Sequence, residues 1–366
     1  MKALILTCRF GQGHHSAAMS IAEEMRVLRP SDDVLVKDLF ELSFPSLHNS
    51  IYHGYAMLMA NGGGLYNFAY KKTAYGNQLE SEKKNPLFGH IIKALRNYVA
   101  SIRPDFIICT YSLAARMVAE YKRESGDSIP LITCVTDITC HNVWMNQETD
   151  FYLVAAESTK KSLLHAGVPE MRIAVRGVPV RQEFTITSIP FLDNLRAGVL
   201  LSGGGLGLLP ENAGFYRALS HLGNIPVTVV AGRNHHLYQK LNGKYANIRV
   251  LGFVEDICHL MRESRLIIGK PGGVTMFESI HTRLPMLLLN PFLEQEVKNA
   301  QFVSEQGLGL QLSKDPEQAI AQIFTAYRDE AWLATVRKNM DGYLHNLDKQ
   351  SFAQFLNSLS GQGRAA

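Results

Sequence analysis

Two glycines and two histidines stand where the first apolar run of the chain ends. Residues 3–8 read ALILTC, and residues 9–18 read RFGQGHHSAA. Glycines after a strand can cradle phosphate, neighbouring histidines can bind a metal, and a single histidine on a tight turn can act as a catalytic base. The loop lacks the third glycine of the dinucleotide fingerprint and the GK[ST] of the P-loop. A purely structural strand-to-helix turn stays open as an alternative.

The metal interpretation is the weakest of the three. His14 and His15 are adjacent, and adjacent residues at the start of a helix do not share a face. No HExxH-type spacing accompanies them. The same argument applies to His235 and His236. We therefore expect no metal site at either pair.

A second stretch whose residue types could bind a ligand covers residues 268–280, which read IGKPGGVTMFESI. An apolar strand ends here, Gly272 and Gly273 allow close approach of a ligand, and a helix begins. The free amides and dipole of a helix N-terminus favour an anion such as phosphate. Glu278, one turn into that helix, could bond a ribose diol or be a solvated helix residue. Polar side chains suited to sugar hydroxyls follow the next strand: Gln295, Glu296 and Asn299.

Short apolar runs alternate with helical patterns along the whole chain. The first series reads KALILTC, DFIICT, PLITCVTD and DFYLVA, and a second begins near residue 197 with AGVLLSGGG. This rhythm is typical of parallel α/β sheets, and ligands of such sheets bind beyond the carboxyl ends of the strands. We expect two Rossmann-like domains with a hinge around 178–194 and a ligand cleft between them. The expected boundaries are 1–181, 195–345 and a final helix in 346–366 that returns to the first domain.

Composition is consistent with a globular intracellular protein. The chain has 366 residues, of which 46% are hydrophobic and 19% charged. No stretch has the length of a signal peptide core or of a bilayer-spanning helix. Five cysteines are scattered without a CxxC pair, which is typical of reduced thiols. They are Cys8, Cys109, Cys134, Cys140 and Cys258.

The net charge of +4 argues against a general nucleic-acid binder, for which a concentrated basic face is expected. Residues 44–100 contain six lysines and arginines but two acidic residues, among many aromatic and apolar side chains. This mixture is typical of a segment that meets anionic lipid head groups. An ordinary helical insertion with a solvated lysine face is the alternative.

Several motifs in a fixed order resemble the monogalactosyldiacylglycerol synthase and processive diacylglycerol glucosyltransferase family, within glycosyltransferase family 28. The chain departs from the family pattern at Gln12 and Glu294, where glycines are common. The matching stretches are GQGH at 11–14, VTDITCHNVW at 135–144, GVPVRQEF at 177–184, SGGGLG at 202–207, VAGRN at 230–234, GFV at 252–254, KPGGVTMFE at 270–278 and QEVKN at 295–299.

The resemblance implies a GT-B fold and an inverting, metal-independent transfer of a sugar from a UDP-sugar. His14 is then the expected general base, because imidazole can accept a proton near neutral pH. Asp137 is the second candidate for that role. His141 and Trp144 would orient Asp137 or line the acceptor site, to which Gly13 also belongs.

On the donor side, the departing diphosphate needs positive potential. We expect it from backbone amides and from Arg233 or Lys270. By analogy with the family, uracil would lie against Phe253 and Val254. The other expected donor-binding residues are Gly204, Gly205, Gly272, Gly273, Val274, Thr275, Glu278, Gln295, Glu296 and Asn299.

The family also implies diacylglycerol or a glycosylated diacylglycerol as acceptor, with UDP-glucose or UDP-galactose as donor. The enzyme would be cytoplasmic and peripheral on the inner face of the cell membrane, in contact with anionic lipid through 44–100. A polyprenyl-linked or other hydrophobic acceptor is an alternative. So are two other classes with the same kind of sheet: a UDP-N-acetylglucosamine 2-epimerase and a non-catalytic nucleotide-sugar sensor.

Overall fold

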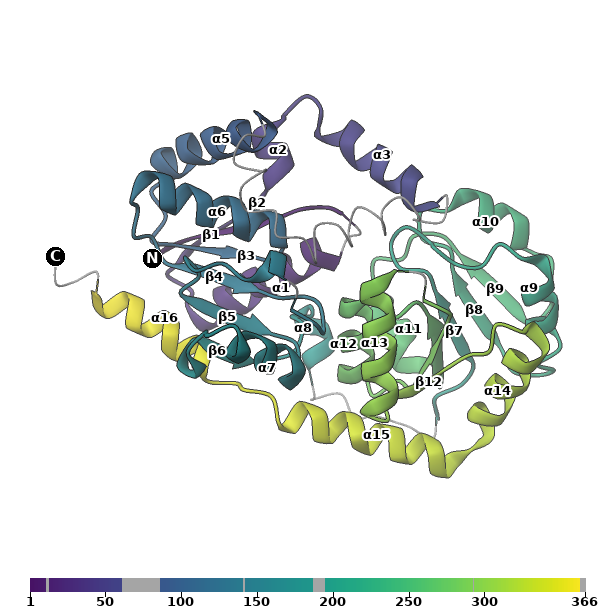
Figure 1. Ribbon diagram of the computed structural model, residues 1–366. Helices are drawn as coiled ribbons and strands as arrows, with labels where there is room; N and C mark the ends of the chain where they lie inside the picture. The colour runs from purple at the N-terminus through teal and green to yellow at the C-terminus, as the bar shows by residue number, and fades with distance from the viewer. Residues whose placement is uncertain (11–12, 61–85, 141, 187–194, 292, 363–366) are drawn as a thin grey trace. The chain divides into compact units, whose positions relative to one another are not determined.

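The chain folds into two compact units, shown in the computed structural model of Figure 1. Unit 1 comprises Met1–Gln182 and Leu347–Ala366, and unit 2 comprises Glu183–Asn346. The structure describes all residues except 11–12, 61–85, 141, 187–194, 292 and 363–366. Each unit holds a six-stranded parallel sheet with helices on both faces. The predicted α/β class with two parallel sheets is therefore confirmed.

The sheet of unit 1 has the order β2-β1-β3-β4-β5-β6. Its strands are β1 (Lys2–Thr7), β2 (Asp33–Asp38), β3 (Phe106–Cys109), β4 (Leu131–Cys134), β5 (Phe151–Val154) and β6 (Ile173–Val175). The α-helices between them are α1 (Gly13–Leu28), α2 (Leu39–Ser43), α3 (His48–Ala60), α5 (Pro86–Ile102), α6 (Ser112–Ser125) and α7 (Glu157–His165). The chain closes unit 1 with α16 (Ser351–Gln362).

Alternation along β1 explains how helices cover both faces of this sheet. Leu4 and Leu6 pack in one buried cluster with side chains of α2, α5 and α6. Ala3 and Ile5 pack in another with side chains of α1 and α16. Successive side chains of a strand point to opposite faces. A strand buried on both faces therefore reads as the continuous apolar run seen in the sequence.

The sheet of unit 2 has the order β12-β11-β10-β7-β8-β9. Its strands are β7 (Val199–Ser202), β8 (Val227–Val230), β9 (Ile248–Leu251), β10 (Leu266–Gly269), β11 (Met286–Leu288) and β12 (Gly309–Gln311). Its helices are α9 (Ala213–Ser220), α10 (His235–Leu241), α11 (Ile257–Glu263), α12 (Gly273–His281), α13 (Glu294–Glu305), α14 (Pro316–Arg328) and α15 (Glu330–His345). The short α8 (Gln182–Thr185) lies in the expected hinge stretch.

Helix α15 of unit 2 packs against α12 and α13 through an aromatic contact. The ring of Tyr343 on α15 lies edge-on to Phe277 of α12 at 5.9 Å and to Phe302 of α13 at 5.5 Å. Edge-to-face pairs at these distances add to the energy of area burial. This contact packs α12 and α13, which carry half of the expected donor-binding residues, against α15.

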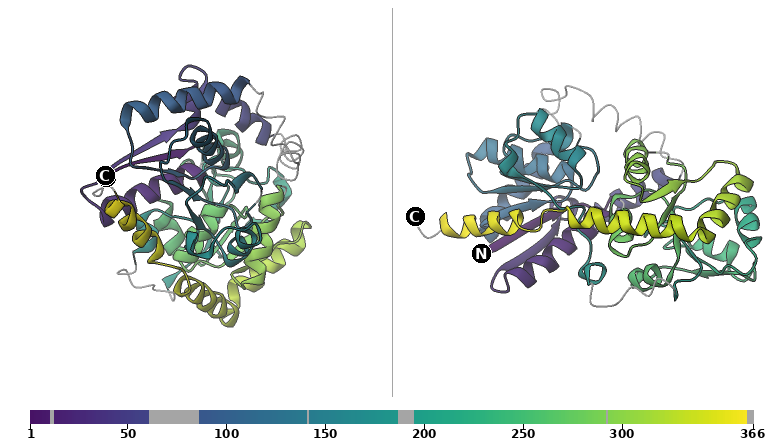
Figure 2. Two further views of the ribbon diagram at one scale, coloured as in Figure 1. Left: turned by 60° about the vertical axis from the view of Figure 1, so that its left-hand side comes forward. Right: turned by 90° about the horizontal axis from the view of Figure 1, so that it is seen from below.

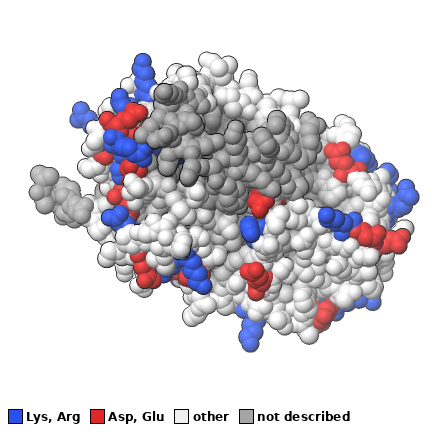
Figure 3. Space-filling model, in the orientation of Figure 1, with Lys and Arg blue, Asp and Glu red and all other residues white. Residues whose placement is uncertain are grey.

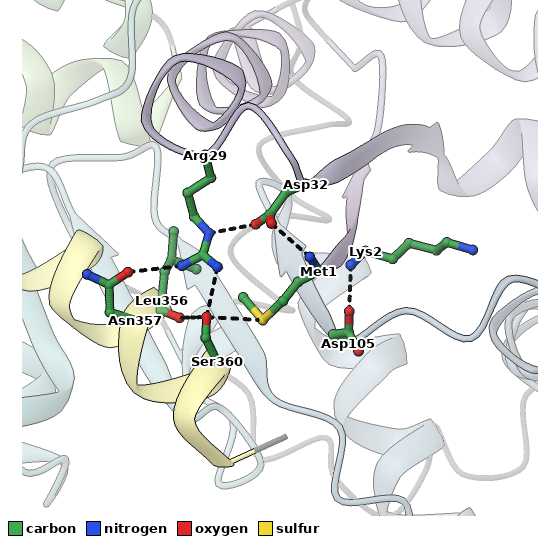
Figure 4. A network of polar contacts seen from close by, with 8 residues as sticks. All are labelled: Met1, Lys2, Arg29, Asp32, Asp105, Leu356, Asn357 and Ser360. Atoms are coloured by element: carbon green, nitrogen blue, oxygen red, sulfur yellow. Dashed lines mark hydrogen bonds and ion pairs between the residues drawn. The ribbon is translucent and has the colours of Figure 1, made fainter. Parts of the chain in front are cut away.

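The last helix of the chain packs on the first strand and helix of unit 1 (Figure 2). Phe352 and Leu356 are 1% and 0% exposed, and their cluster includes Ile5 and Ile21. Figure 4 shows a polar network beside this cluster, in which Arg29, the residue after α1, bonds to α16. Arg29 donates hydrogen bonds to Asn357 at 3.0 Å, to Ser360 at 2.8 Å and to Asp32 at 2.6 Å. The amino group of Met1 also donates to Asp32, at 2.7 Å.

Within the described residues, no helix is both long and apolar enough to cross a bilayer. The five cysteines are buried and unpaired. The expected lipid-facing segment 44–100 is described only for α3, α5 and their flanks, because 61–85 lie outside the described residues.

We expect the apolar contacts of α16 to stabilise unit 1 more than its polar contacts do. Leu356→Ala should lower the free energy of unfolding by about 2–5 kcal/mol, since it leaves a cavity in a closed cluster. Asn357→Ala removes one exposed hydrogen bond and should cost about 1 kcal/mol or less. Urea unfolding followed by circular dichroism measures both. Equal losses in the two variants would contradict this ranking.

Candidate active site

The strand order of unit 1 reverses beside β1. The chain passes from β1 to β2 on one side, and then continues from β3 to β6 on the other side of β1. Ligands of open α/β sheets bind at such a switch point, beyond the carboxyl ends of the strands. His14 lies in the first turn of α1, just after β1, and Thr110 directly follows β3. The predicted base is therefore placed at the switch point.

Two oxygen atoms fix the imidazole of His14. Nδ1 lies 3.1 Å from the backbone oxygen of Thr110 and 2.8 Å from Oγ1 of Thr136, which follows β4. The ring also meets Tyr111 edge-on, with centroids 4.8 Å apart. Burial lowers the pKa of His14 to about 4, against the opposing effect of the Thr110 carbonyl. The imidazole is therefore neutral at physiological pH, as a general base must be.

Asp137 and Trp144 form a second pair on the same sheet edge. Trp144 Nε1 donates to Oδ2 of Asp137 at 3.3 Å, and the Trp144 side chain is 2% exposed. Burial raises the pKa of Asp137 to about 6, while the bond from Trp144 acts to lower it. The Trp144 ring lies 6.4 Å from that of His14, centroid to centroid, so the two pairs are neighbours. Trp144 thus contacts Asp137, one of the two placements expected for it.

Of the residues predicted for the acceptor side besides Trp144, the structure describes Gly13 but not His141. Gly13 is the first residue of α1, next to His14. His141 lies outside the described residues, as do Gly11 and Gln12.

An aromatic cluster beside His14 was not predicted as part of the site. The ring of Phe10 lies edge-on to Phe40 at 5.2 Å and to Tyr52 and Tyr55 of α3 at 4.9 Å each. It also lies 5.7 Å from Tyr111, the residue that meets His14. The aromatic content of residues 44–60 was the available signal. The structure adds that α3 packs on the loop between β1 and the candidate base.

The second sheet also reverses its order, between β7 and β10. The glycine-rich loop after β7 meets the loop after β8 by backbone contacts. Gly232 has a φ of 56°, and a Cβ there would lie 2.7 Å from the oxygen of Gly204 and 2.8 Å from that of Gly205. Arg233 N donates to the Gly205 oxygen at 3.1 Å. Only glycine combines this positive φ with this close approach.

The loops after β8 and β9 bring two predicted donor residues together. The guanidinium carbon of Arg233 lies 5.3 Å from the centroid of the Phe253 ring, which is 55% exposed. Val254 is half-buried on the same loop after β9. Among the residues that the structure describes, Arg233 is exposed and pairs with no carboxylate. Its charge is available to an anion.

The loop after β10 presents the first turn of α12. Gly272 caps this helix without any side-chain hydrogen bond, and a Cβ on it would meet no atom within 4 Å. The backbone amides of Gly273, Val274 and Thr275 follow Gly272 in the first turn of the helix. Helix amides without a side-chain cap favour an anion. Glu278, one turn further, is buried at 9% exposure rather than solvated.

Residues of α13 brace the same loop. Lys270 Nζ and Glu296 Oε1 form an ion pair at 3.0 Å, with both side chains largely buried. Burial lowers the pKa of Lys270, and Glu296 opposes that change. Asn299 Nδ2 donates to the Pro271 oxygen at 2.8 Å. Buried Asn299 Oδ1 and Gln295 Oε1 have no hydrogen-bond partner among the described residues.

A pocket of about 210 Å³ lies within unit 2, at the ends of β11 and β12. None of the predicted donor residues lines it. Its lining consists of Pro210, Asn212, Phe215, Leu289, Asn290, Leu312, Ser313, Lys314, Pro316 and Ala319. Among the described residues, no group of three or more His, Cys, Asp or Glu is arranged to hold a metal ion.

Solved structures with the same fold show the architecture. MurG of Acinetobacter baumannii is 15% identical, with a TM-score of 0.62 over 99% of this chain and 100% of that one. Alr3699/HepE of Anabaena, solved in complex with UDP, is 15% identical, with a TM-score of 0.57 over 98% of this chain and 100% of that one. The predicted GT-B fold is confirmed.

Sequence relatives carry the family assignment. A family model for monogalactosyldiacylglycerol (MGDG) synthase matches residues 14–180. Processive diacylglycerol beta-glucosyltransferases of Bacillus cereus (strain G9842) and Bacillus anthracis (strain A0248) are each 30% identical over 352 residues, covering 93% of this chain and 89% of theirs. With agreement over nearly its whole length, the chain belongs to the family of processive diacylglycerol beta-glucosyltransferases and MGDG synthases, glycosyltransferases of the GT-B fold.

Proposed function

We propose that this protein transfers a hexose from UDP-glucose or UDP-galactose to a hydroxyl of diacylglycerol or a glycosylated diacylglycerol, with inversion at the anomeric carbon. One observation carries the proposal: His14 lies at the switch point of a sheet, where burial lowers its pKa and keeps the imidazole neutral, and both of its polar ring contacts involve Nδ1. A glycosyl transfer to a hydroxyl needs such a base. The names of the sequence relatives support the lipid acceptor and the hexose.

His14 Nε2 would accept the proton of the acceptor hydroxyl as its oxygen attacks the anomeric carbon. The bond from that carbon to the UDP oxygen breaks on the opposite face, and UDP leaves with the electron pair. The proton then passes from His14 to solvent. Asp137 would remain hydrogen-bonded to Trp144 and take no part in the proton transfer, although its pKa of about 6 makes it the competing candidate for the base.

The leaving diphosphate would be stabilised by Arg233 and by the amides of Gly272, Gly273, Val274 and Thr275. The contacts favour Arg233 over Lys270, because Lys270 is paired with Glu296. We therefore assign Lys270, Glu296 and Asn299 to bracing the phosphate-binding loop, and Glu278 to the ribose. Fixed positive charge and amides can supply this stabilisation, so we expect the transfer to proceed without a divalent cation.

The acceptor would be reached from a membrane surface on the cytoplasmic side. Leu47, Met57 and Leu87 on or beside α3 and α5 are 59%, 57% and 45% exposed. Lys93 is exposed nearby, whereas Arg96 pairs with Glu124 at 3.0 Å. Exposed apolar and basic side chains together favour the surface of an anionic bilayer. On the face shown in Figure 3, basic and acidic side chains of the described residues are interspersed, so this face lacks the concentrated basic patch expected of a nucleic-acid binder.

The test is UDP release from UDP-glucose, UDP-galactose and UDP-N-acetylglucosamine, with and without diacylglycerol in mixed micelles, in the presence of EDTA. We expect release to require both one hexose donor and the lipid, and to survive EDTA. If UDP binds but diacylglycerol does not stimulate its release from any donor, the proposed acceptor is wrong. A polyprenyl-linked acceptor and epimerase chemistry are then the next reactions to test.

We expect His14→Ala to lower kcat about 100-fold or more, the scale of a lost general base. The neighbouring His15→Ala is the matched control and should stay within about threefold of wild type. Wild-type kcat/KM should be flat from pH 8 to pH 5, because a base with a pKa of about 4 stays deprotonated throughout. A loss of activity centred near pH 6, absent in Asp137→Asn, would transfer the role to Asp137.

Arg233→Gln should raise the dissociation constant of UDP about tenfold or more, since a charge-assisted hydrogen bond contributes about 1.5–3 kcal/mol. Arg249→Gln removes the same charge from an exposed position on β9 and serves as the control. Isothermal titration calorimetry with UDP measures both. Equal affinities in the two variants would show that Arg233 does not contact the diphosphate.

A further inference from the structure

We infer that Thr136 is a positioning residue: together with the backbone carbonyl of Thr110 it holds His14 in the tautomer that carries hydrogen on Nδ1, so that Nε2 presents its lone pair. The catalytic consequence rests on the proposed function. The tautomer itself rests on geometry alone.

The two contacts of Nδ1 differ in what they allow. The Thr110 carbonyl oxygen, 3.1 Å away, has no hydrogen and can only accept. The contact is attractive only if Nδ1 carries the hydrogen, since the other tautomer would set two lone pairs against each other. The Thr136 hydroxyl oxygen, 2.8 Å away, then accepts a share of the same hydrogen. Such three-centre bonds are common in proteins.

Both anchors are buried and follow neighbouring strands of the sheet. Thr110 is 0% exposed, its N–H donates to Leu6 at 3.1 Å, and its Oγ1 lies 2.9 Å from Oγ1 of Thr7 and from the His14 backbone oxygen. Thr136 is 4% exposed. A base must be held within about half an ångström and 10–20° of its productive geometry. Anchors at the ends of two neighbouring strands, β3 and β4, can impose that precision.

The arrangement differs from a histidine backed by a carboxylate. Among the described residues, Nδ1 of His14 contacts a carbonyl and a hydroxyl, and Asp137 bonds to Trp144 instead. A carbonyl and a hydroxyl set the tautomer and the ring direction without adding a full negative charge behind the base. Thr136 would therefore act on kcat through orientation, with no effect on UDP affinity.

The closing experiment combines ring-¹⁵N histidine NMR with steady-state kinetics on the full chain. Thr136→Val removes the hydroxyl at constant shape, and Thr136→Ser restores it. Thr133→Val is the matched control, because Thr133 is a buried threonine of β4 whose hydroxyl bonds to Thr149 at 3.0 Å. The His14 resonances are assigned by their absence in His14→Ala.

For the wild type at pH 7 we expect a protonated Nδ1 and an unprotonated Nε2. In Thr136→Val the Thr110 carbonyl still keeps hydrogen on Nδ1, but the loss of the second contact should change the chemical shift of Nδ1, loosen the ring orientation and lower kcat about 3- to 10-fold, the range of one hydrogen bond. Thr136→Ser should return kcat to within about twofold of the wild type, and Thr133→Val should change neither the His14 signals nor kcat.

Two outcomes would overturn the inference: a wild-type His14 protonated on Nε2, or a Thr136→Val variant with wild-type signals and kcat. The NMR measurement needs no substrate. If the tautomer and its response to Thr136→Val are as expected but no UDP-sugar is turned over, the inference on His14 is supported and the proposed function alone fails.

Discussion

The reversal of strand order beside β1 and again beside β7 is the constraint on which both candidate sites depend. At such a point, successive loops leave the sheet toward opposite faces and the carboxyl ends between them stay uncovered. In unit 1, this position holds His14 and Thr110. In unit 2, it holds the glycine-rich loop after β7 and the first turn of α12. The rest of each unit provides a buried sheet that fixes those ends in space.

The two units keep polar groups at a sheet edge in different ways. In unit 1, burial is the largest effect on two groups of opposite charge type, so it lowers the pKa of His14 and raises that of Asp137 against an opposing hydrogen bond in each case. In unit 2, the buried Lys270 keeps a partner, Glu296, which offsets the cost of desolvation. Neutral groups suit proton transfer, whereas a fixed ion pair suits a loop that must keep its shape beside a phosphate.

Some features of the site were predictable from residue types, and others were not. His14, Asp137 and Trp144 were named from their motifs, and the contact between Trp144 and Asp137 follows one of the two placements expected. Thr110 carried no signal, because it acts through a backbone carbonyl that every residue possesses. Lys270 was one of two candidate cations, since a sequence shows a charge but not the carboxylate that balances it.

The sequence by itself determined the α/β class, the ends of the strands and the family. These depend on local patterns: apolar runs buried on both faces, glycines at strand ends and motifs in a fixed order. The tertiary structure decided which strand ends are neighbours, which oxygen atoms contact Nδ1 of His14 and, among the described residues, that Lys270 pairs with a carboxylate whereas Arg233 does not. Those properties depend on distances between residues far apart in the chain, and only folding sets such distances.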